Sequence, residues 1–201
     1  MSAEKEPQID TELEAENAVG YKVGEKKTIN EYANLDAEDE ALNKWKQSLG
    51  LSNATGTIGD PNDPRKVVIL EMAIHVDGMP PVVYDLEAPG ALERLRKEPI
   101  VIKEKSKYHL VVKFRVQHEI VTGLKYLQSV KRHGIRLDKT QEVCGSYSPN
   151  TQDKPYYVKE FATEEAPSGM LARGTYEATS KFVDDDNVTH LVFAWYTEIK
   201  K

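Results

Sequence analysis

The side chains that could carry out chemistry are few, and they do not form a catalytic set. Gly24–Thr28 resembles the end of a phosphate-binding loop, but the chain lacks a glycine five residues earlier and a strand ahead of it. His118-Glu119 begins a metalloprotease motif, yet no second histidine follows at the required spacing. No spacing typical of metal ligands relates the remaining histidines, which are His75, His109, His133 and His190.

Cys144 is the only cysteine in the chain. A single cysteine cannot form an internal disulfide or a cysteine-rich zinc site, and no nearby histidine or lysine pattern indicates a lowered thiol pKa. We therefore expect Cys144 to be a small structural side chain. Because the sequence offers no nucleophile, acid–base pair or metal cluster, it predicts a protein that is not an enzyme and that holds no cofactor and no metal.

The sharpest cluster of charge is Asp184-Asp185-Asp186, which lies between two strongly strand-like segments. A polar hairpin turn is one interpretation of this cluster. A turn needs only one or two such residues, however, and three adjacent carboxylates repel one another. The second interpretation is an acidic patch that binds a basic partner, and the sequence pattern leaves both open.

The acidic charge of the chain is concentrated at its beginning. The 201 residues carry a net charge of −6, and residues 1–57 alone hold twelve acidic and six basic side chains. This asymmetry indicates an acidic arm on an electrically balanced domain, and it argues against nucleic acid and for a partner with basic features. The polar N-terminus and the absence of a long apolar run argue against a secretion signal and a membrane span, so we expect a cytoplasmic protein.

The arm contains two signals for short helices, around residues 28–50. Thr28–Glu31 fits a capping box, and Asp36 is a plausible second N-cap. Leu42, Trp45 and Leu49 then fall three and four residues apart, on one helical face. This apolar stripe could pack on the parent domain or dock in a groove of another protein. Because large apolar residues are otherwise sparse in residues 1–57, we expect the free arm to be largely disordered.

The rest of the chain is typical of β-structure. Residues 58–66 are predicted to be a linker, within a stretch rich in Ser, Asn, Gly, Asp and Pro. Residues 67–201 then alternate apolar and polar side chains in four long segments: Val68–Val76, Tyr108–Gln117, Met170–Phe182 and Leu191–Ile199. Shorter candidate strands lie at Val82–Tyr84, Ile100–Ile102, Leu124–Val130, Glu142–Gly145 and Tyr156–Phe161. With no helices expected between them, these segments predict an all-β, antiparallel β-sandwich.

One predicted strand presents unusually small side chains to the interior. The inward positions of Met170–Phe182 include Ala172, Gly174, Ala178 and Ser180. Large residues such as Phe193 and Trp195 are expected to lie opposite. This pattern fits either ordinary packing of large against small side chains, which is the more common case, or a cavity kept open for an apolar ligand.

Several collinear stretches, together running from about Tyr21 to the C-terminus, resemble the Rho GDP-dissociation inhibitor family. They are Leu35–Glu40, Phe114–Val116, Glu119–Tyr126, Asp138–Thr140, Gly145–Tyr147, Glu164–Tyr176, Asp184–Asp186 and His190-Leu191. The resemblance implies an immunoglobulin-like β-sandwich with a flexible regulatory arm. It also implies a non-catalytic regulator that binds geranylgeranylated Rho-family GTPases as a heterodimer. Such a protein extracts them from membranes, holds the isoprenyl lipid between the sheets and inhibits GDP release. The runner-up is a carrier of apolar ligands or lipids with the same sandwich and no GTPase partner.

The resemblance also assigns residues to two surfaces. Tyr21 and Asp39 correspond to arm residues that contact the GTPase, and Asp138 and Asp186 to acidic residues of the sandwich that face it. The full set expected to bind the GTPase is Tyr21, Asp36, Asp39, Leu42, Trp45, Asp138, Asp184, Asp185 and Asp186. The set expected to line the isoprenyl pocket is Ile74, Ile100, Tyr108, Leu110, Val112, Ile120, Phe182 and Trp195.

Overall fold

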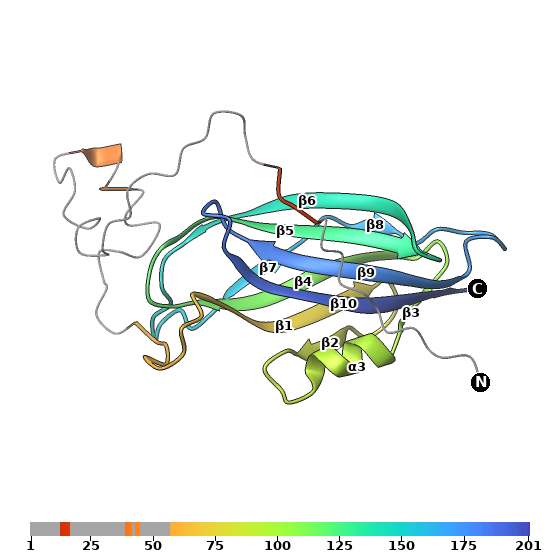
Figure 1. Ribbon diagram of the computed structural model, residues 1–201, viewed down its shortest axis with the longest axis horizontal. Coiled ribbons are helices and arrows are strands. Elements are labelled where there is room, and N and C mark those ends of the chain that lie inside the picture. The colour runs from red at the N-terminus through yellow and green to blue at the C-terminus, as the bar shows by residue number, and fades with distance from the viewer. Residues whose placement is uncertain (1–12, 17–38, 42, 45–56) are drawn as a thin grey trace.

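The computed structural model describes residues 13–16, 39–41, 43–44 and 57–201. Residues 67–201 form two β-sheets that pack face to face, as the sequence predicted (Figure 1). The predictions made for Tyr21, Asp36, Leu42 and Trp45 fall outside the described residues. Within the described part of the chain, no helix has both the length and the apolar character needed to cross a bilayer.

The first sheet has the strand order β2-β1-β4-β7, and a two-residue strand, β8, also pairs with β4. All of its pairings are antiparallel. Its strands are β1 (Val67–Val76), β2 (Val82–Asp85), β4 (Lys107–Val116), β7 (Tyr157–Glu160) and β8 (Glu164–Glu165). The alternation predicted for the segment at Tyr108–Gln117 is confirmed, because buried and half-exposed side chains alternate along β4.

The second sheet has the strand order β3-β10-β9-β5-β6. Its strands are β3 (Ile100–Lys103), β5 (Val121–Arg132), β6 (Ile135–Tyr147), β9 (Gly174–Val183) and β10 (Thr189–Lys200). Every pairing in this sheet is antiparallel except that of β3 with β10, which is parallel. The sandwich is therefore mixed at one edge, a detail that short segments such as Ile100–Ile102 could not reveal.

The sequence analysis expected no helix among the strands, and α3 (Ala91–Lys97) shows that this was wrong. The helix follows Gly90, whose φ of 73° is the left-handed conformation that glycine adopts readily. Only Ala91 and Leu95 are buried, and the helix packs against β10. Seven residues with two buried positions are too few for a helical periodicity to be recognised.

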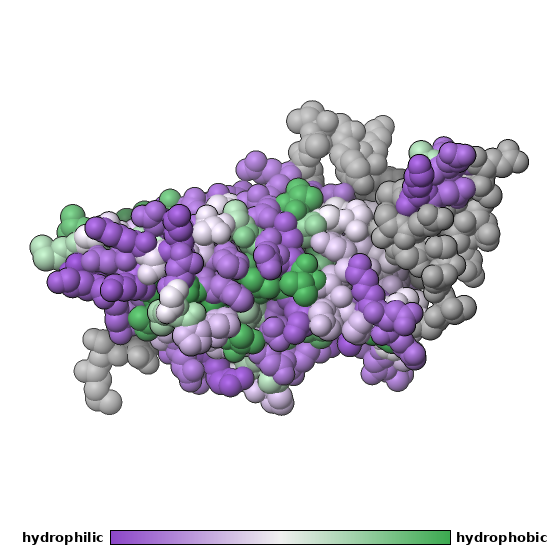
Figure 2. Space-filling view, turned by 180° about the vertical axis from the view of Figure 1, so that it is seen from behind, coloured by the Kyte–Doolittle hydropathy of each residue, from purple (hydrophilic) through white to green (hydrophobic). Residues whose placement is uncertain are grey.

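Strand β9 begins at Gly174, four residues later than the predicted start at Met170. The amides of Ala172 and Arg173 both donate to the Gly169 carbonyl, so residues 169–173 turn instead of extending. Met170 and Leu171 are 84% and 90% exposed, and hydrophobic side chains protrude at one end of the molecule in Figure 2. Ala172, expected to face the interior, therefore belongs to this loop.

The core lies between the two sheets and includes Met72, Phe114, Leu124, Phe182 and Phe193, all nearly inaccessible to solvent. The predicted opposition of large and small residues is confirmed by the register of β9 and β10. Phe193 pairs with Ser180, and Trp195 pairs with Ala178.

Candidate ligand cavity between the sheets

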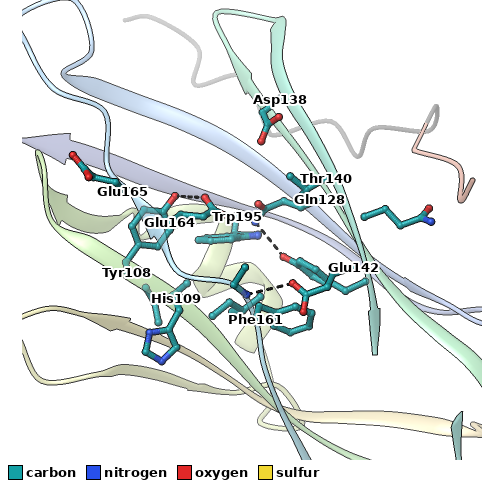
Figure 3. Close-up of a pocket in the computed structure, with 15 residues that line it drawn as sticks. Tyr108, His109, Gln128, Asp138, Thr140, Glu142, Phe161, Glu164, Glu165 and Trp195 are labelled. Atoms are coloured by element: carbon teal, nitrogen blue, oxygen red, sulfur yellow. Dashed lines mark hydrogen bonds between the residues drawn. The ribbon is translucent and has the colours of Figure 1, made fainter. Parts of the chain in front are cut away.

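A cavity of about 560 Å³ opens between the two sheets (Figure 3). This volume lies in the range of ordinary small-molecule sites. Both sheets and the segment around Phe161 contribute to its walls. The lining residues are Ile74, Tyr108, His109, Leu110, Tyr126, Gln128, Asp138, Thr140, Gln141, Glu142, Phe161, Ala162, Glu164, Glu165 and Trp195. The small inward residues of β9 themselves fit ordinary packing of large against small side chains, because Ala178 and Ser180 pair with Trp195 and Phe193 and neither lines the cavity.

Four of the eight residues expected in the pocket do line this cavity: Ile74, Tyr108, Leu110 and Trp195. The other four do not. Ile100, Val112 and Phe182 are buried in the closely packed core, and Ile120 is a half-buried residue just ahead of β5. Alternation shows which face of a strand a residue occupies, but it does not show how far along the strand the two sheets separate.

Sequence reasoning missed two aromatic walls of the cavity, Tyr126 and Phe161. Their ring centroids lie 4.5 Å apart, and the Tyr126 ring also lies 5.1 Å from that of Phe182. Tyr126 pairs directly with Phe182 in the register of β5 and β9. The signal that could have found Tyr126 was therefore its alternation with Leu124 along β5, combined with that cross-strand partner.

The polar groups on the inner wall satisfy one another. Trp195 Nε1 donates to Ser180 Oγ at 2.9 Å, and the Tyr126 hydroxyl lies 2.8 Å from the same oxygen. Gln128 Nε2 in turn donates to the Tyr126 hydroxyl at 3.1 Å. Burial raises the pKa of Tyr126, so the phenol stays neutral. A wall whose polar atoms are already paired offers a ligand mainly apolar contact.

The mouth of the cavity is acidic, because Asp138, Glu142, Glu164 and Glu165 all lie on its rim. The Tyr108 hydroxyl donates to Glu164 at 2.7 Å, and Lys159 pairs with Glu142 at 2.8 Å. Burial, and then the Glu164 hydrogen bond, raise the pKa of Tyr108. An apolar slot with a carboxylate rim is suited to a ligand that joins an apolar tail to a polar or cationic head.

The three aspartates between β9 and β10 have different surroundings. Asp184 is 4% exposed, and it lies 3.0 Å from His190 Nε2 and accepts the Val188 amide at 2.9 Å. Asp185 pairs with Lys125 at 2.8 Å. Position 123 must be glycine for the Asp185 carboxylate to lie this close to the backbone, since a Cβ there would be 1.8 Å from the carboxylate. Asp186 is half-buried. The cluster is therefore built into the fold, with Asp184 directed inward and not toward a partner.

Asp184→Asn is expected to make the free energy of unfolding depend less on pH in the acid range. Burial by itself would raise the pKa of Asp184, but the hydrogen bonds from His190 and Val188 outweigh it and lower the pKa below 3.8. The charged carboxylate therefore stabilises the folded state above about pH 4, and this contribution is lost as pH falls through the lowered pKa. Urea unfolding from pH 7 to 2 should show the variant about 1–3 kcal/mol less stable at neutral pH, with the difference shrinking in acid.

The exposed Asp153 supplies a control for this experiment. Asp153→Asn should leave the curve unchanged. Parallel curves for Asp184→Asn and the parent chain would contradict the assignment.

The expected GTPase-binding residues of the sandwich do not gather at one place. Asp138 lies on the cavity rim and pairs with Val130, toward the C-terminal end of β5. Asp185 donates its amide to the Thr122 carbonyl, at the start of the same strand. Eight residues of strand separate these points, about 27 Å. A partner that contacts both would have to cover most of the length of the sandwich.

Two pieces of the arm are described. Asp39 precedes a helical turn, and its carboxylate accepts the Ala41 amide at 2.8 Å. Asp39 therefore caps this turn. Asp39 is exposed.

The other described piece, Leu13–Glu16, rests on the outer face of the second sheet. Leu13 is buried against Leu127 and Val183. The Lys181 ammonium donates to the Leu13 carbonyl at 3.0 Å, and Gln141 exchanges two hydrogen bonds with the Glu16 backbone. This short piece of the arm therefore has a place on the sandwich, where a buried leucine provides about 1.5–3 kcal/mol of apolar contact.

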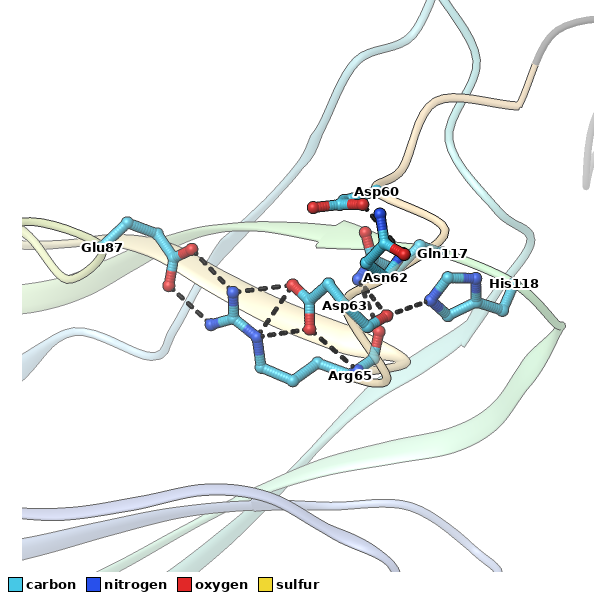
Figure 4. Close-up of polar contacts among 7 residues, drawn as sticks. All are labelled: Asp60, Asn62, Asp63, Arg65, Glu87, Gln117 and His118. Atoms are coloured by element: carbon cyan, nitrogen blue, oxygen red, sulfur yellow. Dashed lines mark hydrogen bonds and ion pairs between the residues drawn. The ribbon is translucent and has the colours of Figure 1, made fainter.

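The segment predicted as a linker is held against the sandwich (Figure 4). The Arg65 guanidinium bridges the carboxylates of Asp63 and Glu87, with its shortest contact to each at 2.7 Å. The buried Gln117 donates to the Arg65 carbonyl at 2.7 Å. The Ile58 amide donates to the Asn150 carbonyl. The arm therefore leaves the sandwich from a fixed point.

Cys144 lies in a place that fits a structural role. Burial raises the pKa of its thiol to about 12, in spite of the nearby Lys159. Among the residues that the structure describes, no three His, Cys, Asp or Glu side chains are arranged to hold a metal ion.

A cavity between the sheets of a β-sandwich is the kind of place where proteins bind small apolar ligands. The sequence matches the family described as RHO protein GDP dissociation inhibitor over residues 5–201. It is 49% identical to a Rho GDP-dissociation inhibitor of Saccharomyces cerevisiae, with 94% of each chain covered. It is 50% identical to that of Schizosaccharomyces pombe, covering 89% of this chain and 85% of the relative. Against Rho GDP-dissociation inhibitor 1 of Bos taurus the identity is 40%, over 100% of this chain and 95% of the relative.

The chain therefore belongs to the RHO protein GDP dissociation inhibitor family. Membership confirms the family resemblance noted in the sequence. It also identifies the chain as a regulatory binding protein and not an enzyme.

Proposed function

We propose that this protein binds geranylgeranylated Rho-family GTPases in the cytoplasm, withdraws them from membranes into a one-to-one complex and inhibits GDP release. Family membership supports the GTPase as partner, and the observation that carries the lipid part is the cavity of about 560 Å³ between the sheets. A carrier of apolar ligands without a GTPase partner is not favoured, because the match to the family includes nearly the whole chain.

The energetics of the lipid make such a cavity necessary. Moving a geranylgeranyl chain from the bilayer into water costs on the order of 10 kcal/mol, at about 0.8 kcal/mol per carbon unit. A soluble complex must offer the chain an environment comparable to the bilayer. The inner wall of this cavity, with Ile74, Leu110, Phe161 and Trp195, provides apolar surface, and the acidic rim suits a polar or cationic segment that follows the lipid.

The arm provides the second contact. Asp39 caps a helical turn on an arm that joins the sandwich at a fixed point, so each contact with the GTPase raises the effective concentration of the other. Inhibition of GDP release follows if the arm binds best to the conformation of the switch regions that holds the nucleotide. Tyr21, Asp36, Leu42 and Trp45 remain proposed contacts of the arm.

The decisive experiment compares GDP-loaded Rho-family GTPase with and without its geranylgeranyl group. Titration of the full chain should give an affinity at least about a hundredfold higher for the prenylated form, because burial of the lipid is added to the protein contact. The weaker affinity for the unprenylated form measures the arm and sandwich surface alone. Equal affinities would show that the cavity does not hold the lipid.

A further inference from the structure

Two neighbouring aliphatic side chains stand almost fully in solvent at one end of the sandwich. Met170 is 84% exposed and Leu171 is 90% exposed, and on the adjacent β5–β6 hairpin Ile135 and Leu137 are 67% and 56% exposed. Isolated apolar residues on a surface need no explanation, but several gathered at one end of a molecule indicate an interaction site. We refer to Met170, Leu171, Ile135 and Leu137 as the apolar tip.

The loop that carries Met170 and Leu171 is held in place by charged side chains. Arg132 donates to the Leu171 carbonyl and, at 2.6 Å, to the Arg173 carbonyl, and its guanidinium lies 5.0 Å from the Tyr176 ring centroid. Glu104 accepts from Arg173 at 2.9 Å and from the Gly169 amide at 3.1 Å. Hydrogen bonds from both sides therefore present the two aliphatic side chains outward.

The turns around the apolar tip are rich in basic residues. Residues 103–107, 131–136 and 166–173 contain seven lysines and arginines and one acidic residue, Glu104, which pairs with Arg173. The carboxylates of Asp138, Glu164 and Glu165, on the cavity rim, adjoin these ranges. The basic residues are Lys103, Lys105, Lys107, Lys131, Arg132, Arg136 and Arg173. Backbone hydrogen bonds between Lys105 and Ala166 and between Ala166 and Ser106 join the first and third of these turns. Basic side chains thus outnumber acidic ones around the aliphatic side chains.

This end of the molecule adjoins the mouth of the cavity. Strand β8, Glu164–Glu165, forms part of the cavity rim, and the loop to Met170 follows it directly. Lys107 pairs with Glu165 across the two strands. The β9–β10 turn, with Asp184–Asp186, lies at the other end of the sandwich (Figure 1).

We propose that the apolar tip and its surrounding basic residues form a docking site for an anionic lipid bilayer. In the docked state Met170 and Leu171 enter the boundary between head groups and acyl chains, and the lysines and arginines lie over the lipid phosphates. The proposal deepens the proposed function, on which its purpose rests: it brings the cavity, with its acidic rim, near the membrane surface from which an isoprenyl chain would be taken up.

A bilayer fits this surface better than a protein partner does. Met170 and Leu171 lie in the turn at residues 169–173, and both are almost fully exposed, so they do not line a groove. Protein interfaces deplete lysine at their centre and cover about 800 Å² per partner. Basic residues next to two protruding aliphatic side chains are typical of peripheral membrane sites.

The first experiment measures sedimentation of the full chain with vesicles in the absence of any GTPase. We expect binding to vesicles of phosphatidylcholine and phosphatidylserine in about a two-to-one ratio, weak binding to phosphatidylcholine alone, and loss of binding as salt is raised. The double variant Met170→Ser/Leu171→Ser should bind at least about tenfold more weakly. Its melting temperature should be unchanged, because neither side chain is packed.

Val158→Ser is the matched control, since Val158 is 51% exposed on β7, away from the apolar tip. It should bind vesicles like the parent chain. Equal binding to neutral and anionic vesicles, or normal binding by the double variant, would overturn the proposal. So would a double variant that binds vesicles normally but loses affinity for unprenylated GTPase, because the tip would then be a protein interface.

A second experiment reports insertion directly. An environment-sensitive fluorophore on Leu171→Cys should brighten with anionic vesicles, and the same label on Val158→Cys should not. The raised pKa and burial of Cys144 keep the native thiol poorly reactive toward the label. Failure of the GTPase comparison described under the proposed function would leave these vesicle results unaffected, so the two proposals can fail separately.

Discussion

Thr140→Trp is expected to lower the affinity for a geranylgeranylated Rho-family GTPase about a hundredfold and to leave the affinity for the unprenylated protein unchanged. Thr140 lines the cavity from β6, the edge strand of the second sheet, and is itself exposed. An indole at this position can fill the slot from its open side without displacing core side chains. The lipid then loses much of its burial free energy. Parallel titrations with the two forms of the GTPase measure the effect.

Val143→Trp supplies the matched control for this prediction. Val143 lies on the same strand, is 58% exposed and pairs with Lys125, on the outer face of the sheet. The same large side chain there should leave both affinities unchanged. If Thr140→Trp bound the prenylated GTPase as tightly as the parent chain does, the lipid would have to lie elsewhere.

The long strands could be predicted because each one carries its signal, the alternation of apolar and polar residues, within its own segment. A strand with one face in the core must alternate, so the segments at Val68–Val76 and Leu191–Ile199 stood out from their own residues. Elements without an extended apolar face could not be recognised from their own residues. Strand β8 has two exposed glutamates and exists because β4 offers it hydrogen bonds, and α3 buries only Ala91 and Leu95.

The cavity could be predicted only in part, because it depends on long-range register. The small residues Ala178 and Ser180, opposite Trp195 and Phe193, suggested space in the core, but neither of them lines the cavity. The outer walls are Phe161 and the β6 residues Asp138 and Thr140 to Glu142, which come from segments with weak patterns of their own. Residues such as Val112 and Phe182 have the same alternation as Leu110 but lie where the sheets are in contact.

Charge was the least predictable property. Three adjacent aspartates looked alike in the sequence, yet Asp184 is buried beside His190 and Asp185 pairs with Lys125. Their differences arise from the partners that the fold brings to them. In the same way, the docking of Leu13 on Leu127 and Val183 joins residues more than a hundred positions apart, which no local pattern encodes.

Ser180→Ala is expected to destabilise the sandwich by about 2–4 kcal/mol in urea unfolding, a large effect for the loss of one oxygen atom. Ser180 is inaccessible to solvent, and its hydroxyl is the shared partner of Trp195 Nε1 and the Tyr126 hydroxyl. Removing it leaves two buried polar groups short of a partner. Tyr126→Phe alone should cost about 1 kcal/mol, because the indole keeps its acceptor. In the double variant Ser180→Ala/Tyr126→Phe, no phenol hydroxyl is left without a partner. The loss of stability in the double variant should therefore be smaller than the sum of the losses in the two single variants. Strict additivity would mean that the three groups do not act as one network on the cavity wall.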